Sequence, residues 1–71
     1  MKYIILGYSN PNIKTGKADV SVLCKNDFAI WWELTDRCNA NNYWLFDTRK
    51  EADEYAELFK LNNCITYGIY V

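Results

Sequence analysis

The three cysteines are the side chains of this 71-residue chain that are best suited to chemistry. Cys24, Cys38 and Cys64 lie far apart, form no Cys-x-x-Cys pair, and have no histidine to act with them. A zinc site would need all three thiolates and a carboxylate, so the sequence disfavours a metal site. Because Cys24 and Cys64 fall on predicted strands, we interpret them as small buried apolar side chains. The odd number of cysteines also argues against a disulfide scaffold.

Catalytic residues of the usual kinds are missing from the sequence. It contains no histidine for general acid–base work, no Gly-rich loop for phosphate, and no nucleophile beside a residue that would activate it. Asp36, Arg37 and Cys38 are neighbours, but exposed charges in a loop explain this group adequately. The sequence therefore predicts a protein that is not an enzyme and that needs no cofactor, metal ion or small-molecule substrate.

The strands are indicated by short apolar runs between turn-forming residues. They are expected at residues 2–8, 18–24, 28–34 and 64–71. Turn-forming residues 9–12 end the first strand, and Asn26-Asp27 fits a tight turn between the second and the third. The first three strands would then form an antiparallel meander. Residues 43–46 form either a further short strand or the lead into a helix.

One helix is indicated by a capping signal followed by an apolar stripe. Thr48 and Glu51 are spaced as a capping box, in which each side chain satisfies a main-chain N–H of the other residue. The stripe has i, i+3, i+4, i+7 spacing and consists of Ala52, Tyr55, Ala56 and Phe59. We expect a helix from about residue 49 to about residue 61 that packs on one face of the sheet. The predicted fold class is α+β, with residues 1–71 in a single domain.

The adjacent Trp31 and Trp32 must lie on opposite faces of the third strand. The core face is expected to carry the wholly apolar set Phe28, Ile30, Trp32 and Leu34. One helix covers only one face of the sheet, so the other face would present its aromatic side chains to a protein partner or a second copy. The expected interface consists of Trp31, Glu33, Tyr43, Trp44 and Tyr70. A simpler alternative is that Trp31 lies under the loop at residues 36–42 or against charged neighbours.

The outer face of the predicted helix is acidic at Asp53, Glu54 and Glu57. Such a face is most often only solvated. The functional alternative is that it meets a basic surface of a partner.

The charge balance favours a protein partner over nucleic acid. Residues 1–26 carry four lysines and one acid, and residues 27–71 carry eight acids and four bases, for a net charge of -1. Single-strand nucleic-acid binding is the alternative function, because aromatic side chains on an open sheet can stack bases while Lys14, Lys17 and Lys25 line one edge. No clustered basic stripe and no RNP-like segment accompany them.

The chain is expected to be cytosolic. Residues 1–7 are too short an apolar run for a signal peptide, and no segment approaches the ~20 apolar residues of a membrane-spanning helix. The unpaired thiols predict a reducing compartment, and the lack of a long apolar segment predicts no membrane partner. A chain of this length has a small core, so its aromatic residues, 17% of the total, or self-association must add stability.

The junction from Phe46 to Ala56 resembles the Phe-x-Thr-x-x-Glu-Ala pattern at the strand-to-helix junction of many small phage, prophage and plasmid proteins. The resemblance implies an accessory protein of a mobile element, and such proteins often act by binding and blocking a host protein. The matching residues are structural, so no functional residue is carried over.

Overall fold

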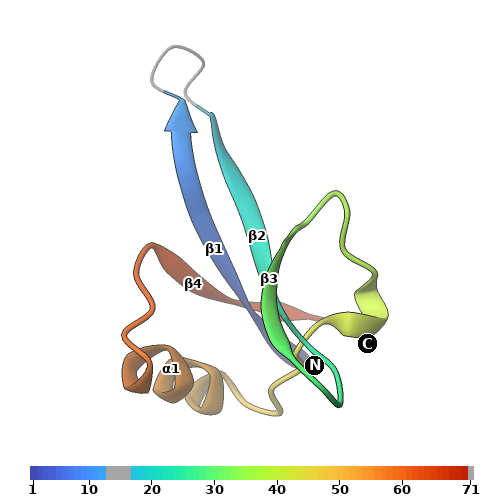
Figure 1. Cartoon of the computed structure of the whole chain (residues 1–71). Helices are drawn as coiled ribbons and strands as arrows, with labels where there is room; N and C mark the ends of the chain where they lie inside the picture. Colours follow the sequence, from blue (N-terminus) through green and yellow to red (C-terminus); the bar gives the residue numbers. More distant parts are fainter. Residues whose placement is uncertain (13–16, 71) are drawn as a thin grey trace.

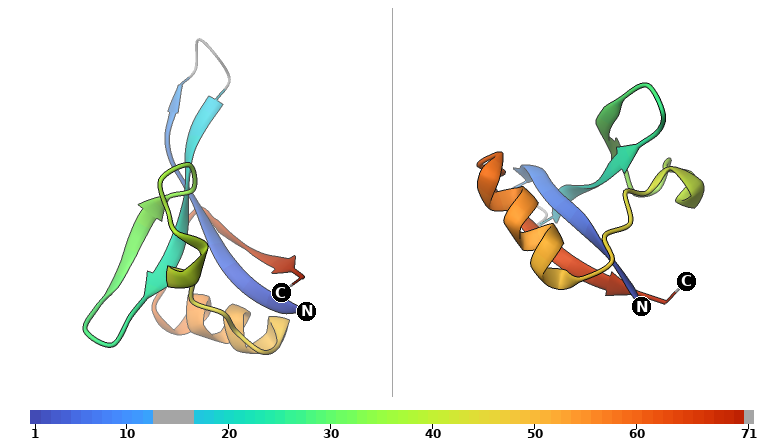
Figure 2. Two further views of the ribbon diagram at one scale, coloured as in Figure 1. Left: turned by 90° about the vertical axis from the view of Figure 1, so that its right-hand side faces the viewer. Right: turned by 90° about the horizontal axis from the view of Figure 1, so that it is seen from below.

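A computed structural model describes residues 1–12 and 17–70, which form one antiparallel sheet and one α-helix (Figure 1). The strands are β1 (Lys2–Asn12), β2 (Lys17–Lys25), β3 (Ile30–Leu34) and β4 (Cys64–Ile69), in the order β3-β2-β1-β4. Between β3 and β4 lie a 3-10 helix, η1 (Ala40–Asn42), and an α-helix, α1 (Arg49–Leu58). The α1 helix packs against β1 and β4 on one face of the sheet (Figure 2). The predicted α+β class is confirmed.

The first hairpin is longer than predicted, because β1 continues through the turn-forming residues 9–12. Ser9 and Asn12 both pair with β2, with an irregularity between them. Pro11 lies in this irregular stretch, where its missing main-chain N–H does not interrupt a regular ladder. Pairing with β2 thus overrides the local turn propensity.

The Asn26 side chain organises the loop between β2 and β3. Its Oδ1 accepts hydrogen bonds from the N–H groups of Phe28 and Ala29, each 2.8 Å long. The Asn26 N–H in turn donates to the Ala29 carbonyl at 3.0 Å. Because this turn holds residues 26–29 in a loop, β3 begins at Ile30 and the expected core position of Phe28 is wrong. Phe28 projects from the loop with 95% of its surface exposed.

Residues 43–46 cross the sheet where β1 and β2 separate. Phe46 pairs with Tyr3 of β1, and Tyr43 pairs with Cys24 of β2. Phe46 and Tyr3 exchange two main-chain hydrogen bonds, 2.8 and 2.9 Å long. Tyr43 packs on the face opposite α1 and Phe46 packs beneath α1, so the segment passes from one face to the other. It forms isolated bridges and not a further strand.

The α1 helix begins at the predicted cap. The Thr48 Oγ1 accepts a hydrogen bond from the Glu51 N–H, 3.1 Å away. Just before the cap, Asp47 forms an ion pair with Lys2 at the start of β1. The hydrogen bond from Lys2, and secondly its charge, lower the pKa of the Asp47 carboxyl. This pair ties the start of the helix to the sheet.

The helix ends earlier than predicted, at Leu58. Lys60 has a left-handed φ of 52°, and the Leu61 N–H donates to the Ala56 carbonyl at 2.9 Å. This is the Schellman ending, usually made with glycine at the left-handed position. Phe59, the last residue of the expected stripe, is the C-cap of the helix; its ring still lies 4.5 Å from that of Tyr55, but it is 58% exposed.

Two small cores lie on the two faces of the sheet. The core beneath α1 contains Ile5, Leu23, Phe46 and Ala52. The core on the opposite face contains Ile4, Val22 and Cys24. The burial of Cys24 confirms its interpretation as an apolar core residue. Neither core is large, and many apolar side chains stay outside both of them.

Candidate functional site

Trp31 lies on the face opposite α1, as the strand alternation predicts, but it is not left uncovered. It pairs with Cys24 and packs, half-buried, against the second core together with Cys38 and Tyr43. The segment that carries Cys38, η1 and Tyr43 therefore lies over this face. The expectation that Trp31 has no place within the chain is wrong, and the alternative that places it by the loop holds.

Trp32 is the more exposed of the two tryptophans, with 41% of its surface accessible. It pairs with Leu23, so its indole lies on the same face as α1. However, α1 packs over β1 and β4, whereas β3 is at the far edge of the sheet. Ile30, expected in the core, is likewise 53% exposed. The predicted core face of β3 is thus largely open.

The Trp32 indole leans over Gly7 of β1. A Cβ atom added at Gly7 would lie 3.0 Å from Trp32 Cζ3, too close for an ordinary contact. The missing side chain at Gly7 therefore leaves room for the edge of the Trp32 six-membered ring above β1.

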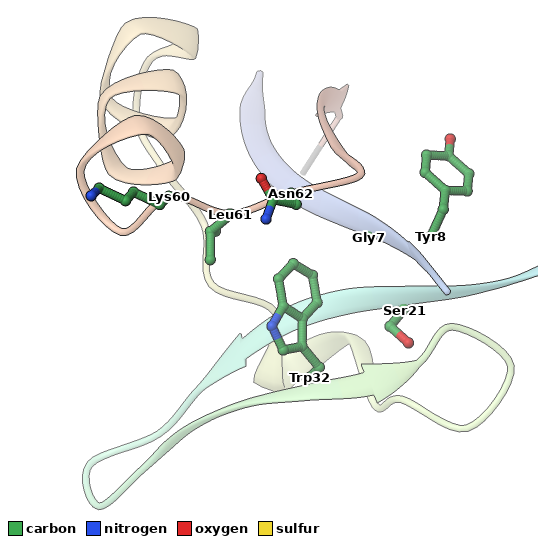
Figure 3. A pocket seen from close by; sticks show the side chains of 7 residues that line it. All are labelled: Gly7, Tyr8, Ser21, Trp32, Lys60, Leu61 and Asn62. Atoms are coloured by element: carbon green, nitrogen blue, oxygen red, sulfur yellow. The ribbon is translucent and has the colours of Figure 1, made fainter. Parts of the chain in front are cut away.

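A cavity of about 410 Å³ opens beside Trp32 (Figure 3). It lies between the β1, β2 and β3 strands and the segment that follows α1. Its lining consists of Gly7, Tyr8, Ser21, Trp32, Lys60, Leu61 and Asn62. Figure 3 shows the Trp32 ring directed toward Leu61 and Asn62. Sequence reasoning missed this site, although the early left-handed turn at Lys60 is what places Leu61 opposite Trp32.

A second hollow, of about 360 Å³, lies along the other side of α1. Its aromatic lining is one cluster, in which the Trp44 ring stacks on that of Phe46 at 4.8 Å and meets that of Tyr55 edge-on at 4.5 Å. The Lys25 ammonium lies 4.6 Å above the Trp44 ring. Glu51, Glu54 and Leu58 complete the lining. Trp44 therefore belongs to the α1 face, so the structure does not bring it together with Trp31.

The predicted interface residues are thus divided. Trp31, Glu33 and Tyr43 lie on the face opposite α1, since Glu33 pairs with Val22 of the second core. Trp44 lies on the α1 face. Tyr70 lies just beyond the end of β4 and is 88% exposed.

Tyr70 follows the β4 residues that lie on the α1 face, although the sequence predicts it beside Trp31. Cys64 packs against the core beneath α1, and the Thr66 hydroxyl donates a hydrogen bond to Asp53 of that helix. Ile65 and Tyr67 consequently point to the opposite face, where they are 45% and 52% exposed. The predicted place of Tyr70 on the Trp31 face is wrong, because the position of α1 and not the strand alternation decides which set of β4 residues is covered. Val71, the expected last residue of this strand, lies outside the described residues.

The acidic residues of α1 do not form one unpaired surface. Asp53 accepts the hydrogen bond from Thr66, and Glu54 lies 3.9 Å from the ammonium of Lys50. Glu57 is exposed. The cations named for nucleic-acid binding are also dispersed: Lys25 covers Trp44, and Lys14 lies outside the described residues.

Two of the three thiols meet. Cys24 Sγ lies 3.0 Å from Cys38 Sγ, and Cys64 lies on the other face of the sheet. Burial, and secondly the hydrogen bond with Cys38, raise the pKa of Cys24 to about 12. Burial also raises the pKa of Cys64. In the described part of the chain, no three His, Cys, Asp or Glu side chains are grouped to hold a metal ion.

Comparison of the chain with protein-family models, with curated proteins and with solved structures finds no match. Among the described residues, no helix is long and apolar enough to cross a membrane.

Proposed function

We propose that this chain is a non-enzymatic protein-interaction domain that binds an apolar segment of a partner protein in the cavity beside Trp32. The observation that carries the proposal is an indole, 41% exposed, that forms one wall of a cavity of about 410 Å³. Tryptophan side chains set against such pockets are frequent anchors of protein interfaces. The binding surface is therefore on the α1 face, and not on the Trp31 face that the sequence favours.

The lining of the cavity suggests the chemistry of the partner segment. Trp32 and Leu61 offer apolar contacts to one buried side chain. Lys60 and Asn62 add polar side chains, and Figure 3 shows the Lys60 ammonium directed away from Trp32, on the outer side of the cavity. An apolar residue inside the cavity followed by an acidic one outside it matches this arrangement, with the carboxylate directed to Lys60.

The wider biological role extends the same proposal. The junction from Phe46 to Ala56 supports an accessory protein of a mobile element that binds and blocks a host protein. A cytosolic location is supported by the three free thiols.

Selection of random displayed peptides against the immobilised protein tests the cavity. Trp32→Ala removes its aromatic wall, and Ser21→Arg fills it with a long charged side chain without deleting a packed residue. We expect the selected peptides to carry an apolar residue beside an acidic one, and each variant to weaken their binding at least about tenfold. Tyr70→Ala is the matched control, since it deletes an exposed aromatic side chain elsewhere and should leave binding unchanged. Peptides that bind both cavity variants as well as the parent would refute the proposal.

Fluorescence titration with oligothymidylate tests the alternative function, which is single-strand nucleic-acid binding. We expect no quenching of tryptophan emission at low salt, because the described cations are dispersed. Quenching that weakens steeply with added salt would instead support nucleic acid as the ligand.

A further inference from the structure

The outer edge of β4 carries a row of unpaired main-chain groups. Tyr3 directs its N–H and carbonyl to Phe46, on the β2 side of β1, whereas the Tyr8 N–H donates to the Asn63 carbonyl on the β4 side. Successive residues of a strand direct these groups to opposite edges. Lys2, Ile4 and Leu6 of β1 therefore bond to β4, and their partners are Ile69, Tyr67 and Ile65. The alternate residues of β4, which are Cys64, Thr66 and Gly68, direct their main-chain groups to the outer edge.

This edge lacks the features that normally protect an edge strand. β4 is the last strand of the sheet, and no main-chain hydrogen bond reaches its outer edge from another described residue. Residues 61–71 contain no charged side chain and no proline. Charged side chains, proline and bulges are the usual means of blocking such edges. An uncharged edge strand with exposed Ile65 and Tyr67 is consequently a template for another strand.

The other edge of the sheet is less suitable for pairing. On β3 the Leu34 carbonyl already accepts hydrogen bonds from the N–H groups of Arg37 (2.9 Å) and Cys38 (3.0 Å). These bonds close one end of a strand that has only five residues. The β4 edge has no comparable closure among the described residues.

The pattern of β4 is self-complementary. Ile65, Tyr67 and Ile69 lie on one face and read the same in both directions about Tyr67. An antiparallel second β4 centred there would place Tyr67 beside Tyr67 of the second copy and each Ile65 beside Ile69 of the other copy. Thr66 would then lie opposite Gly68 of the second copy. Both residues direct their main-chain N–H and carbonyl groups to the outer edge, so they would form a hydrogen-bonded pair. Cross-strand aromatic and β-branched pairs of this kind stabilise antiparallel sheets.

The same register accounts for Tyr70 and for a hollow beside the strand. Tyr70 of the second copy would lie opposite Cys64. A hollow of about 460 Å³ adjoins Cys64 and Thr66 beneath α1, with Arg49 and Asp53 in its lining. The exposed Tyr70 ring, which continues the α1 face of its strand, would have space there, and its hydroxyl would face the polar side chains of Arg49 and Asp53.

We propose that two copies of this chain pair through their β4 strands, antiparallel and centred on Tyr67, to form a symmetric dimer with one continuous sheet. The dimer surface is at the opposite edge of the sheet from β3 and Trp32. It is therefore distinct from the cavity of the proposed function, and either proposal can fail alone. Edge pairing also gives a small domain the additional buried surface that its two cores do not supply.

Sedimentation velocity over a range of concentrations tests the dimer. Tyr67→Lys places two like charges side by side at the twofold axis, and Tyr67→Glu does the same with acids. We expect the parent to be a dimer and each variant alone to dissociate with at least about a tenfold higher dissociation constant. An equal mixture of the two variants should restore the dimer, because Lys then faces Glu. This rescue also shows that both variants fold.

Ile30→Lys is the matched control, since it adds the same charge at an exposed apolar position of the other edge strand. It should leave the dimer intact. A parent chain that stays monomeric up to about 1 mM overturns the proposal. So does a dimer that Ile30→Lys dissociates and Tyr67→Lys does not, or a mixture of Tyr67→Lys and Tyr67→Glu that stays monomeric.

Discussion

Cys24 Sγ lies 3.0 Å from Cys38 Sγ, which joins the C-terminal end of β2 to the segment that covers Trp31. The two residues are separated by 14 positions in the chain, and nothing in their spacing predicts that they meet. The contact forms because β3 returns alongside β2 and the turn after Leu34 brings Cys38 back over Cys24. The thiol pair is thus a product of the hairpin and of the loop that closes it.

Oxidised glutathione should convert this pair into a disulfide. The more accessible Cys38 thiolate attacks glutathione disulfide, releases one glutathione thiolate and forms a mixed disulfide. Cys24 then loses its proton and attacks Cys38 Sγ, which releases the second glutathione and leaves the protein lighter by two hydrogen atoms. Because burial raises the pKa of Cys24 above its ordinary value of 9.0, its thiolate is a minor species at pH 7 to 8 and increases with pH, and we expect the second step to accelerate as the pH rises.

Mass spectrometry of the quenched reaction measures both steps. Cys38→Ser should give no intramolecular disulfide, and Cys64→Ser should react as the parent does, since Cys64 lies on the other face. Closure of a loop of this size should stabilise the protein against urea by about 3 kcal/mol. Equal disulfide yields in the parent and in Cys38→Ser would contradict the predicted pairing.

Trp31 should contribute more to stability than Trp32. The sequence suggests the opposite, because it places Trp32 in the core and Trp31 on an open face. Trp31→Ala removes a half-buried ring from the second core and is expected to cost about 2–4 kcal/mol of unfolding free energy. Trp32→Ala removes a more exposed ring and should cost about 1 kcal/mol. Urea unfolding followed by circular dichroism measures both without relying on tryptophan emission.

Tyr70→Ala serves as the control when all three substitutions are made in the monomeric Tyr67→Lys background, because its ring is 88% exposed in the single chain and its loss there should leave the stability unchanged. A larger loss of stability for Trp32→Ala than for Trp31→Ala would show that the loop does not hold Trp31 as described.

Local sequence patterns predict the helix and the strands well, but they predict poorly which face of each strand is buried. The cap at Thr48 and the opposite faces of Trp31 and Trp32 follow from short-range rules, and both are present. Which face of each strand is covered depends on where α1 lies along the sheet, and this is decided by strand order. The crossing of residues 43–46 between β1 and β2 likewise rests on contacts with distant residues such as Tyr3. Periodicity carries no information on the position of α1 or on the path of residues 43–46. It therefore predicts a core position for Trp32, which the structure leaves 41% exposed.

The Lys2–Asp47 ion pair predicts a dependence of stability on pH. Lys2 lowers the pKa of Asp47 in the folded protein below the ordinary value of 3.8. A carboxyl with a lowered folded pKa stabilises the fold above its unfolded pKa, and the effect is lost as the pH falls through the folded pKa. The parent should therefore be slightly more stable than Asp47→Asn at neutral pH, with the difference vanishing in acid.

Urea unfolding of both proteins at a series of pH values measures this difference. Added salt should reduce it at neutral pH, because the pair is exposed to solvent. A difference that stays constant from neutral pH down to about pH 2 would show that the ionised Asp47 is not its source.

Replacing Lys60 by glycine should stabilise the protein, in contrast to most substitutions. Lys60 holds a left-handed φ of 52° at the position of the Schellman ending where glycine is usual, and a residue with a Cβ atom is strained there. We expect Lys60→Gly to raise the free energy of unfolding by about 0.5–1 kcal/mol.

Lys60→Ala is the control, because it removes the same charge but keeps the Cβ atom, so it should bring no gain in stability. Asn63→Gly, at φ 53°, should gain less than Lys60→Gly because asparagine tolerates this conformation. Equal stabilities of Lys60→Gly and Lys60→Ala in urea would contradict the left-handed ending of α1.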